Sequence, residues 1–417
     1  MRTDSNLREI LRRYGVWIGL TLAFALYYPR FAHDMSQGIA RGGLSLLTHG
    51  AECLLAGEVL QACDLFFTYP PAFAFVMLPF VPMKPGIAMV VWYLVTIGAT
   101  IVAYMLSETL ARRIFPGDWT EKELAWLRLG SILLSIKFIL AVLENQAFDT
   151  LVLLFILIGL WALVMKREVL SGGSIAFAAA IKGSPLIFLP YLLFTRRFVA
   201  AGTFIGVYLA TSFLPDLFFT PKSGFGYFLT WVREIALGPL YDDLELTKYL
   251  FWAGVNSNNH SLRAVAYQLF PSGLADPWFR PTLAAMYLPV VAAAAIIVIK
   301  SMRNGGLVAI DGAVVLIAML VLSPMTSRSH FVALILPYTI ACAAYIRDPA
   351  TRRLGQIVLV ISFILATATG NDLVGGWFTD WAYSLHVLAL GSLLLLIYLA
   401  AIAFRQRMPS QAAQLGR

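Results

Sequence analysis

The chain has 417 residues, of which 59% are hydrophobic and 13% are charged, and its formal net charge is +8 at pH 7. A soluble domain carries about 25% charged residues, so this composition excludes a soluble protein and indicates one that is solvated mainly by lipid. The basic residues form small clusters between apolar runs, as in cytoplasmic loops of membrane proteins, which argues against nucleic acid as a partner. The three cysteines form no CxxC motif, so the sequence offers no zinc or redox motif.

The first predicted membrane span covers residues 14–32. It follows Arg2, Arg8, Arg12 and Arg13, and this cluster places the N-terminus on the cytoplasmic side. A cleaved signal peptide would have small residues after the apolar run, whereas bulky residues follow it here. We therefore expect a first membrane helix that is retained.

Residues 31–68 are predicted to form a loop on the outer side of the membrane. Part of this loop has apolar residues at helical spacing: Leu44, Leu47, Ala51, Leu54 and Leu55. The pattern predicts helices that lie along the membrane surface. The next apolar stretch, residues 69–82, is too short to span a bilayer, so we expect a re-entrant or interfacial piece.

The rest of the chain alternates apolar runs with short polar connections. Predicted spans cover residues 86–111, 124–143, 148–165, 198–219, 282–299, 307–322, 330–346, 354–369 and 382–404. Residues 171–194 are apolar but interrupted by Lys182, Gly183 and Pro185, which predicts two short helices beside a cavity. Residues 220–281 form the largest polar segment and are expected outside. We therefore predict one all-α polytopic domain over residues 1–417, with about a dozen membrane helices and both termini inside.

In this topology the unusual polar residues gather on the outer side. They are His33, Asp34, Asn145, Gln146, Asp149, Lys182, the run 256–260, His330, Asn371 and Asp372. Several of them lie within or at the ends of apolar spans, where a polar group is costly to keep. This arrangement predicts a functional site at the outer face.

Three of these positions have a chemical interpretation and a structural alternative. Asp34 follows the first span and is a candidate general base, or an ordinary interface residue. Lys182 stands in an apolar stretch and is a candidate ligand of a lipid phosphate, as Lys137 is to a lesser degree, or a side chain that reaches the headgroups. Arg328 and His330 together form a candidate phosphate or pyrophosphate site, although a histidine at the end of a span can be purely structural.

Cys53 and Cys63 both fall in the first outer loop and leave two possibilities open. On one continuous helix they would lie about 15 Å apart, too far for a disulfide. Gly57 between them can end the helix, and in an oxidising compartment the two cysteines could then pair.

Several segments, read in order, follow a known pattern. They are Asp34, then Leu55-Ala56-Gly57, Tyr69-Pro70-Pro71, Asn145-Gln146-Ala147-Phe148-Asp149, Lys182-Gly183-Ser184-Pro185, Asn259-His260-Ser261-Leu262-Arg263, and Ser323-Pro324-Met325-Thr326 with His330. Read together, they resemble glycosyltransferase family 87, whose members have the GT-C fold and take mannose from polyprenyl phosphate. The chain departs from the pattern at Asn145, usually glycine, and at His260, usually glutamine.

The resemblance implies an inverting transfer of a hexose, expected to be mannose, with Asp34 as general base and His330 in the active site. The expected substrate-binding residues are Tyr69, Asn145, Gln146, Asp149, Lys182, Asn259, His260, Arg263 and Arg328. A polyprenyl phosphate leaving group can be stabilised by Lys, Arg and His alone, and no carboxylate pair has metal spacing, so we expect neither metal nor cofactor.

The expected partners are a polyprenyl-phosphate-sugar donor, a glycolipid or glycan acceptor and membrane lipid. The expected location is the bacterial inner (plasma) membrane, with the site on its outer face. Two alternatives stay open: a polymerase or ligase that uses a diphosphate-linked donor, and a transporter or flippase. A transporter often shows inverted repeats, and none stands out in this sequence.

Overall fold

The computed structural model describes residues 2–36, 42–222, 225–238 and 258–406, and every regular element in these ranges is a helix. In the N-terminal half the elements are α1 (Arg2–Ser36), α2 (Gly43–Leu55), α3 (Leu60–Cys63), α4 (Pro71–Met77), η1 (Leu78–Phe80), α5 (Pro85–Ile114), α6 (Glu121–Glu144), α7 (Asp149–Val164), α8 (Glu168–Ile181), η2 (Ser184–Ile187), α9 (Phe188–Phe194) and α10 (Phe198–Phe218). In the C-terminal half they are α11 (Tyr227–Trp231), η3 (Val232–Ala236), α14 (Leu262–Leu269), η4 (Gly273–Ala275), α15 (Phe279–Arg303), α16 (Val308–Leu322), η5 (Arg328–Leu334), α17 (Ile335–Arg347), α18 (Arg352–Ser362), η6 (Phe363–Thr367), α19 (Asn371–Val374), α20 (Gly376–Ser384) and α21 (Val387–Arg405).

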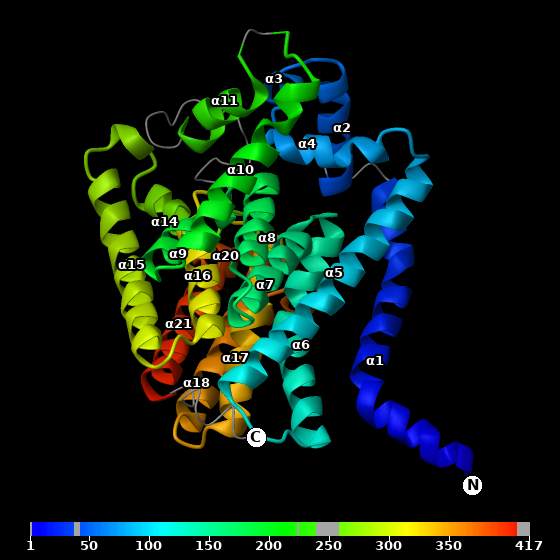
Figure 1. Cartoon of the computed structure of the whole chain (residues 1–417), viewed down its shortest axis with the longest axis vertical. Coiled ribbons are helices and arrows are strands. Elements are labelled where there is room, and N and C mark those ends of the chain that lie inside the picture. The colour runs from blue at the N-terminus through cyan, green and yellow to red at the C-terminus, as the bar shows by residue number, and fades with distance from the viewer. Residues whose placement is uncertain (1, 37–41, 223–224, 239–257, 407–417) are drawn as a thin grey trace.

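The long apolar helices confirm an all-α integral membrane protein. Within the described residues, six helical stretches are long and apolar enough to cross a bilayer: α5, α6, α10, α15, α21 and η5 continued by α17. Shorter apolar helices, among them α7, α8 and α16, pack between them. In the most hydrophobic 18-residue stretch of η5–α17, 83% of the residues are buried inside the protein. In the corresponding stretch of α15 only 17% are buried. The first of these therefore lies at the centre of the bundle, and α15 stands at its edge (Figure 1).

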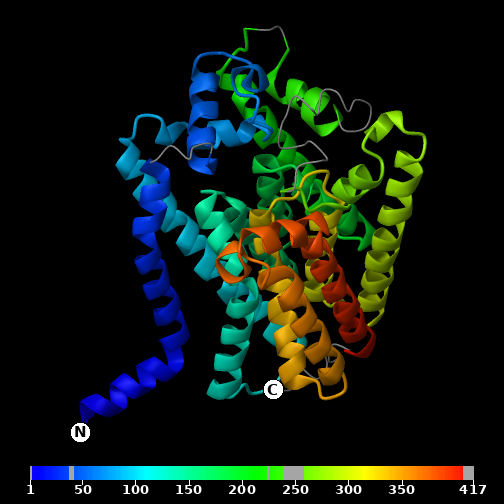
Figure 2. The same cartoon turned by 180° about the vertical axis from the view of Figure 1, so that it is seen from behind.

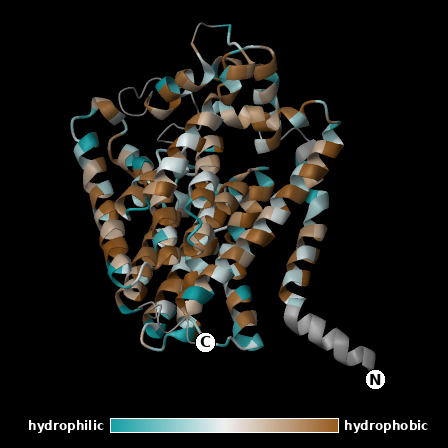
Figure 3. Cartoon of the chain, in the orientation of Figure 1, coloured by the Kyte–Doolittle hydropathy of each residue, from teal (hydrophilic) through white to brown (hydrophobic). Residues whose placement is uncertain are grey.

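The molecule has two distinct ends. At one end α2, α3, α4 and α11 form a compact group, which we call the cap, at the top of Figure 1. The start of α1 and the end of α21 lie at the other end, and Figure 2 shows the same division from behind. Hydrophobic residues cover the long helices between the two ends (Figure 3).

The end opposite the cap collects the basic residues that follow the spans, and we call it the basic end. Arg113 Nη2 lies 3.1 Å from the sulfur of Met165, which joins the ends of α5 and α7. Arg197 pairs with Glu168 at 3.3 Å. Arg347 lies 3.4 Å from a Glu123 carboxylate oxygen. These contacts connect the basic residues to neighbouring helix ends, and the sidedness of the basic clusters stays a prediction.

The break at Lys182 is confirmed. Helix α8 ends at Ile181, Lys182 has an extended backbone, and η2 begins at Ser184 with Pro185 in its first turn. Proline cannot donate the backbone hydrogen bond that a continuing helix needs, so the chain turns here.

Two predicted boundaries were wrong. Helix α1 continues to Ser36, beyond the expected end at residue 32.

The second incorrect boundary is in the last predicted span, residues 382–404. It is divided between α20 and α21 because His386 adopts a left-handed backbone with φ of 50°. The predicted outer segment 220–281 contains α11, η3, α14 and η4 and the start of α15, while its residues 223–224 and 239–257 lie outside the described ranges.

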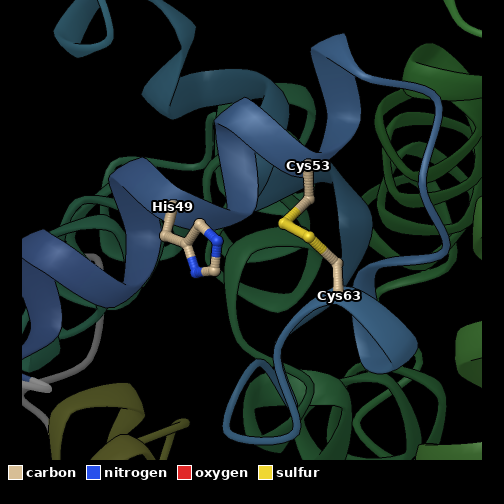
Figure 4. Close-up of side chains that lie close together, drawn as sticks. All are labelled: His49, Cys53 and Cys63. Carbon is tan, nitrogen blue, oxygen red and sulfur yellow. A yellow bond between two sulfur atoms is a disulfide. The ribbon is translucent and has the colours of Figure 1, made fainter.

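The cap contains a disulfide between Cys53 and Cys63, whose Cα atoms lie 6.1 Å apart. Helix α2 ends at Leu55, and Gly57 has φ of +70°, so the chain reverses and α3 returns toward α2. The apolar residues at helical spacing on α2 are buried within the protein, except Leu55, which is exposed. The structure therefore takes the second of the two possibilities for the cysteines (Figure 4).

His49 lies beside this disulfide, and the three side chains have the proximity of a metal site. Both sulfur atoms are already bonded to each other, so neither is available as a thiolate ligand. His49 Nδ1 lies 3.1 Å from Asp64 Oδ2. The group therefore serves to hold the cap together and does not fit a metal ion.

Candidate active site

A cavity of about 510 Å³ lies between the cap and the apolar helices. Its described walls come from the start of α2, residues 66–70, the α6–α7 connection, the break after α8, α11 with η3, Asn258, and the region from Met319 to His330. Six predicted site residues line it: Tyr69, Asn145, Asp149, Lys182, Arg328 and His330. Residues that are far apart in the sequence therefore meet at one site.

An ion pair between the buried residues Lys182 and Asp149 lines the cavity. Asp149 is the first residue of α7, and Lys182 follows the last residue of α8, so the pairing of these two helices brings them together. Lys182 Nζ donates to Asp149 Oδ1, and both side chains are buried. The ammonium also lies 5.3 Å from the centre of the Phe148 ring. The charge of Lys182 is therefore compensated within the protein.

His330 lines the cavity, and the hydrogen bonds of its ring fix which nitrogen carries the proton. Its Nδ1 accepts from the backbone N–H of Ser327 at 3.0 Å and lies 2.7 Å from the Ser327 hydroxyl. Because Nδ1 is used as an acceptor, the neutral ring carries its proton on Nε2. His330 lines the cavity next to Ser329 and Arg328.

Arg328 is the one arginine among the described residues that line the cavity. It lines the cavity and forms no ion pair with any carboxylate in the described part of the chain. Its guanidinium lies 5.9 Å from the centre of the Tyr383 ring. The described residues of the cavity wall therefore carry one net positive charge from Arg328, beside the neutral Lys182–Asp149 pair.

Asn259 and His260 lie behind the wall and hold it in place. Asn259 Nδ2 donates to the Pro324 carbonyl at 3.0 Å, and its Oδ1 accepts from the Thr326 amide at 3.1 Å. The His260 amide donates to the Thr326 carbonyl at 2.8 Å. Burial, His386 and the charges of Lys137 and Arg328 lower the pKa of His260 to about 3, so its ring is neutral at pH 7.

Thr326 connects this support to the site itself. Its backbone amide and carbonyl are held by Asn259 and His260, and its hydroxyl donates to the Leu320 carbonyl at 2.6 Å. These contacts anchor the loop that leads from α16 to Arg328 and His330. Asn259 and His260 therefore shape the cavity wall without lining the cavity.

Gln146 and Arg263, also predicted as site residues, do not line the cavity. The Gln146 carbonyl accepts from Trp92 Nε1 at 2.9 Å, and its side chain packs against Gly42, where a Cβ atom would lie 2.2 Å from Oε1. Gln146 thus fixes the start of α2 against the α6–α7 connection. Arg263 is buried, with its guanidinium 3.2 Å from the Tyr267 hydroxyl.

Asp34 lies near the end of α1 and is not among the residues that line the cavity. Its side chain is 27% exposed, and its Oδ2 lies 4.0 Å from Arg30 Nε. Arg30 in turn lies 3.7 Å from Glu144, the residue before the cavity-lining Asn145. The structure thus places Asp34 on the cavity side of the molecule, and its role as a base stays a prediction.

The sequence interpretation did not select Trp231, Met319 or Leu322 as site residues, although they form part of the apolar wall of the cavity. Trp231 Nε1 donates to the Thr68 carbonyl at 3.0 Å and so joins α11 to the segment before α4. Apolar side chains in an apolar chain carry no separate signal in the sequence, which is why Met319 and Leu322 were missed. The one available signal was a tryptophan within the largest polar segment.

The chain is similar in sequence to a known glycosyltransferase. A curated relative from Mycobacterium tuberculosis (strain CDC 1551 / Oshkosh), named polyprenol-phosphate-mannose-dependent alpha-(1-2)-phosphatidylinositol pentamannoside mannosyltransferase, is 29% identical over 198 residues. The match covers 46% of this chain and 44% of the relative, so it spans less than half of either protein. No solved structure matches the chain significantly.

The sequence profile of glycosyltransferase family 87 matches residues 67–324. The matched region includes the Lys182–Asp149 pair and ends just before Arg328 and His330. Since it covers well over half of the sequence, the chain belongs to glycosyltransferase family 87.

Proposed function

We propose that this protein transfers a hexose, mannose in the simplest case, from a polyprenyl-phosphate-sugar to a glycolipid or glycan acceptor. The observation that carries the proposal is the composition of the cavity wall. Arg328 supplies one positive charge that no carboxylate of the described residues pairs with, and His330 has an Nε2–H donor, while Ile187, Met319 and Leu322 supply apolar surface. A ligand with one phosphate charge and a long apolar chain matches both surfaces.

The charge balance favours a monophosphate donor over a diphosphate-linked one. A polyprenyl-phosphate-sugar is a phosphodiester with one negative charge, and a diphosphate-linked donor has two. The Lys182 charge is already offset by Asp149, which leaves the charge of Arg328 to be matched by the ligand. The name of the mycobacterial relative includes the same donor class, which supports the proposal.

In the proposed reaction the acceptor hydroxyl attacks the anomeric carbon of the donor sugar. The bond from that carbon to the phosphate oxygen breaks, and polyprenyl phosphate leaves with the electron pair. Attack from the opposite face inverts the anomeric configuration. In this reaction Arg328 and the His330 Nε2–H stabilise the developing phosphate charge.

We assign Asp34 as the base that removes the acceptor proton. We also propose a GT-C type arrangement for the membrane helices.

Two features support an orientation with the cavity on the outer face. The basic residues lie at the end opposite the cap, in accordance with the excess of positive charge on cytoplasmic loops. The Cys53–Cys63 disulfide lies in the cap, and disulfides persist in oxidising compartments.

A membrane transfer assay tests the proposed function. Membranes that contain the protein are incubated with radiolabelled polyprenyl-phosphate mannose, and lipid and glycan products are separated. We expect label to enter a product in wild-type membranes and not in membranes without the protein. Label transferred only from a diphosphate-linked donor would support the polymerase or ligase alternative. Movement of intact donor across the bilayer without transfer would support a transporter.

Arg328→Ala is expected to raise the KM for the donor by about 10-fold to 100-fold, because it removes a charge-assisted contact to phosphate worth about 1.5–3 kcal/mol. The kcat should fall no more than KM rises. The matched control is Arg352→Ala, which removes an exposed arginine at the start of α18 on the basic end. If Arg328→Ala has the wild-type KM, the phosphate does not bind at this wall.

Cysteine labelling in intact cells is expected to show the cap outside and the basic end inside. Cys53 and Cys63 are paired and Cys342 is buried, so an introduced cysteine would be the accessible thiol among the described residues. Lys222→Cys, at a side chain that is 66% exposed, should react with an impermeant reagent, and Arg405→Cys should react only after the cells are lysed. The reverse result would refute the proposed orientation.

A further inference from the structure

Tyr383 lies in α20, outside the region matched by the family profile, and its buried ring faces two cations. The centre of the ring lies 5.1 Å from Lys137 Nζ and 5.9 Å from the Arg328 guanidinium carbon. The face of an aromatic ring is electron-rich and attracts a cation at such distances. The ring therefore stabilises both charges.

The other groups around the ring hold it in place. The His260 ring packs edge to face against it, with centroids 4.8 Å apart. Lys137 is itself fixed, because its Nζ donates to the Ala366 carbonyl at 2.9 Å and to the Thr369 hydroxyl at 2.8 Å. Tyr383 thus presents a buried, well-packed surface to a side chain that reaches the cavity wall.

The Tyr383 ring is the contact that holds the Arg328 guanidinium against repulsion from Lys137. Arg328 forms no ion pair with a carboxylate in the described ranges, and the fixed ammonium of Lys137 contacts the same aromatic ring. Without the ring, repulsion from Lys137 would displace the guanidinium, since no carboxylate of the described residues forms an ion pair with it.

We propose that Tyr383 is a positioning residue that holds Arg328 at the cavity wall in the orientation that binds the donor phosphate. This inference rests on the proposed function, because it assigns the phosphate to Arg328. The ring acts through Arg328 and need not touch the donor.

The test measures binding of polyprenyl phosphate, the leaving group, to the purified full-length protein. Tyr383→Leu removes the ring and is expected to raise the Kd about fivefold to tenfold. Tyr383→Phe keeps the ring and should bind within about twofold of wild type. The matched control is Trp119→Leu, which removes the ring that lies 4.4 Å from Arg347 at the basic end and should leave the Kd unchanged.

A double-mutant comparison separates positioning from a general structural effect. If Tyr383 acts through Arg328, Tyr383→Leu should add little to the Kd of Arg328→Ala. Independent, multiplying effects of the two substitutions would overturn the proposal. So would a Tyr383→Phe variant that binds as weakly as Tyr383→Leu.

Fluorinated phenylalanines at position 383 provide a second measurement if Tyr383→Leu fails to fold. Fluorine withdraws electron density from the ring face and changes its shape little, so the Kd should rise with each added fluorine. A flat series would overturn the role of the ring. If wild-type protein neither binds polyprenyl phosphate nor transfers from its sugar conjugate, the proposed function fails; if it does both and the series is flat, only the role of Tyr383 fails.

Discussion

Asp34→Asn is expected to slow sugar transfer by at least about 100-fold, the usual scale for loss of a general base. The substitution keeps the size of the side chain and removes its ability to accept a proton. The acceptor hydroxyl is a poor nucleophile unless its proton is removed as the new bond forms. The measurement is kcat in the transfer assay at saturating donor, together with the Kd for polyprenyl phosphate, which should stay at the wild-type value.

Glu144→Gln is the matched control for this prediction. Glu144 and Asp34 both lie beside Arg30, so each substitution removes one carboxylate charge from the same neighbourhood. Glu144→Gln should retain most of the activity. If Asp34→Asn transfers sugar at nearly the wild-type rate, Asp34 is an interface residue, and the resemblance at the N-terminus is misleading.

Lys182→Met is expected to destabilise the protein by about 3–5 kcal/mol, because it leaves the buried Asp149 carboxylate without a partner. Asp149→Asn leaves the ammonium unpaired and should be destabilising in the same way. The double variant Lys182→Met/Asp149→Asn leaves neither charge uncompensated, so it should recover most of the lost stability. Thermal unfolding in one detergent gives the order of stability of the purified wild type and the three variants.

The exposed pair of Lys222 and Glu58 is the control for this double-mutant cycle. Its side chains are 66% and 46% exposed, so each single substitution there should cost less than about 1 kcal/mol. If Lys182→Met unfolds at the wild-type temperature, the Asp149 charge is not buried as the structure shows. A stable double variant that binds polyprenyl phosphate normally would exclude Lys182 as a phosphate ligand.

The sequence predicts much of the helical framework because hydropathy reports directly on contact with lipid. The break at Lys182 was predictable, since a charge, a glycine and a proline interrupt an otherwise apolar run. The helix α2 was also predictable from its apolar spacing, but the sequence did not show that its apolar face packs within the protein. The extension of α1 to Ser36 was not, because its last turns are polar and carry no hydropathy signal.

The sequence predicted individual residues of the candidate site, but it did not predict which of them contact one another. Lys182 and Asp149 were both selected, but their pairing depends on how α7 and α8 align, which no local pattern reveals. Asn259 was predicted to bind the substrate. In the structure its side chain accepts from the Thr326 amide and supports the loop that carries Thr326. Tyr383 was not selected, because its contacts with Lys137 and Arg328 join segments far apart in the sequence, which no local pattern reveals.

The order of Asp149 and Lys182 along the chain has a consequence for biosynthesis. An isolated lysine at the centre of a membrane helix costs about 2.5–3.5 kcal/mol to insert. Asp149 leaves the ribosome 33 residues before Lys182, at the start of the first helix of the α7–α8 hairpin. The partner is thus already synthesised when the lysine emerges, and the hairpin can enter the bilayer with its two charges neutralised.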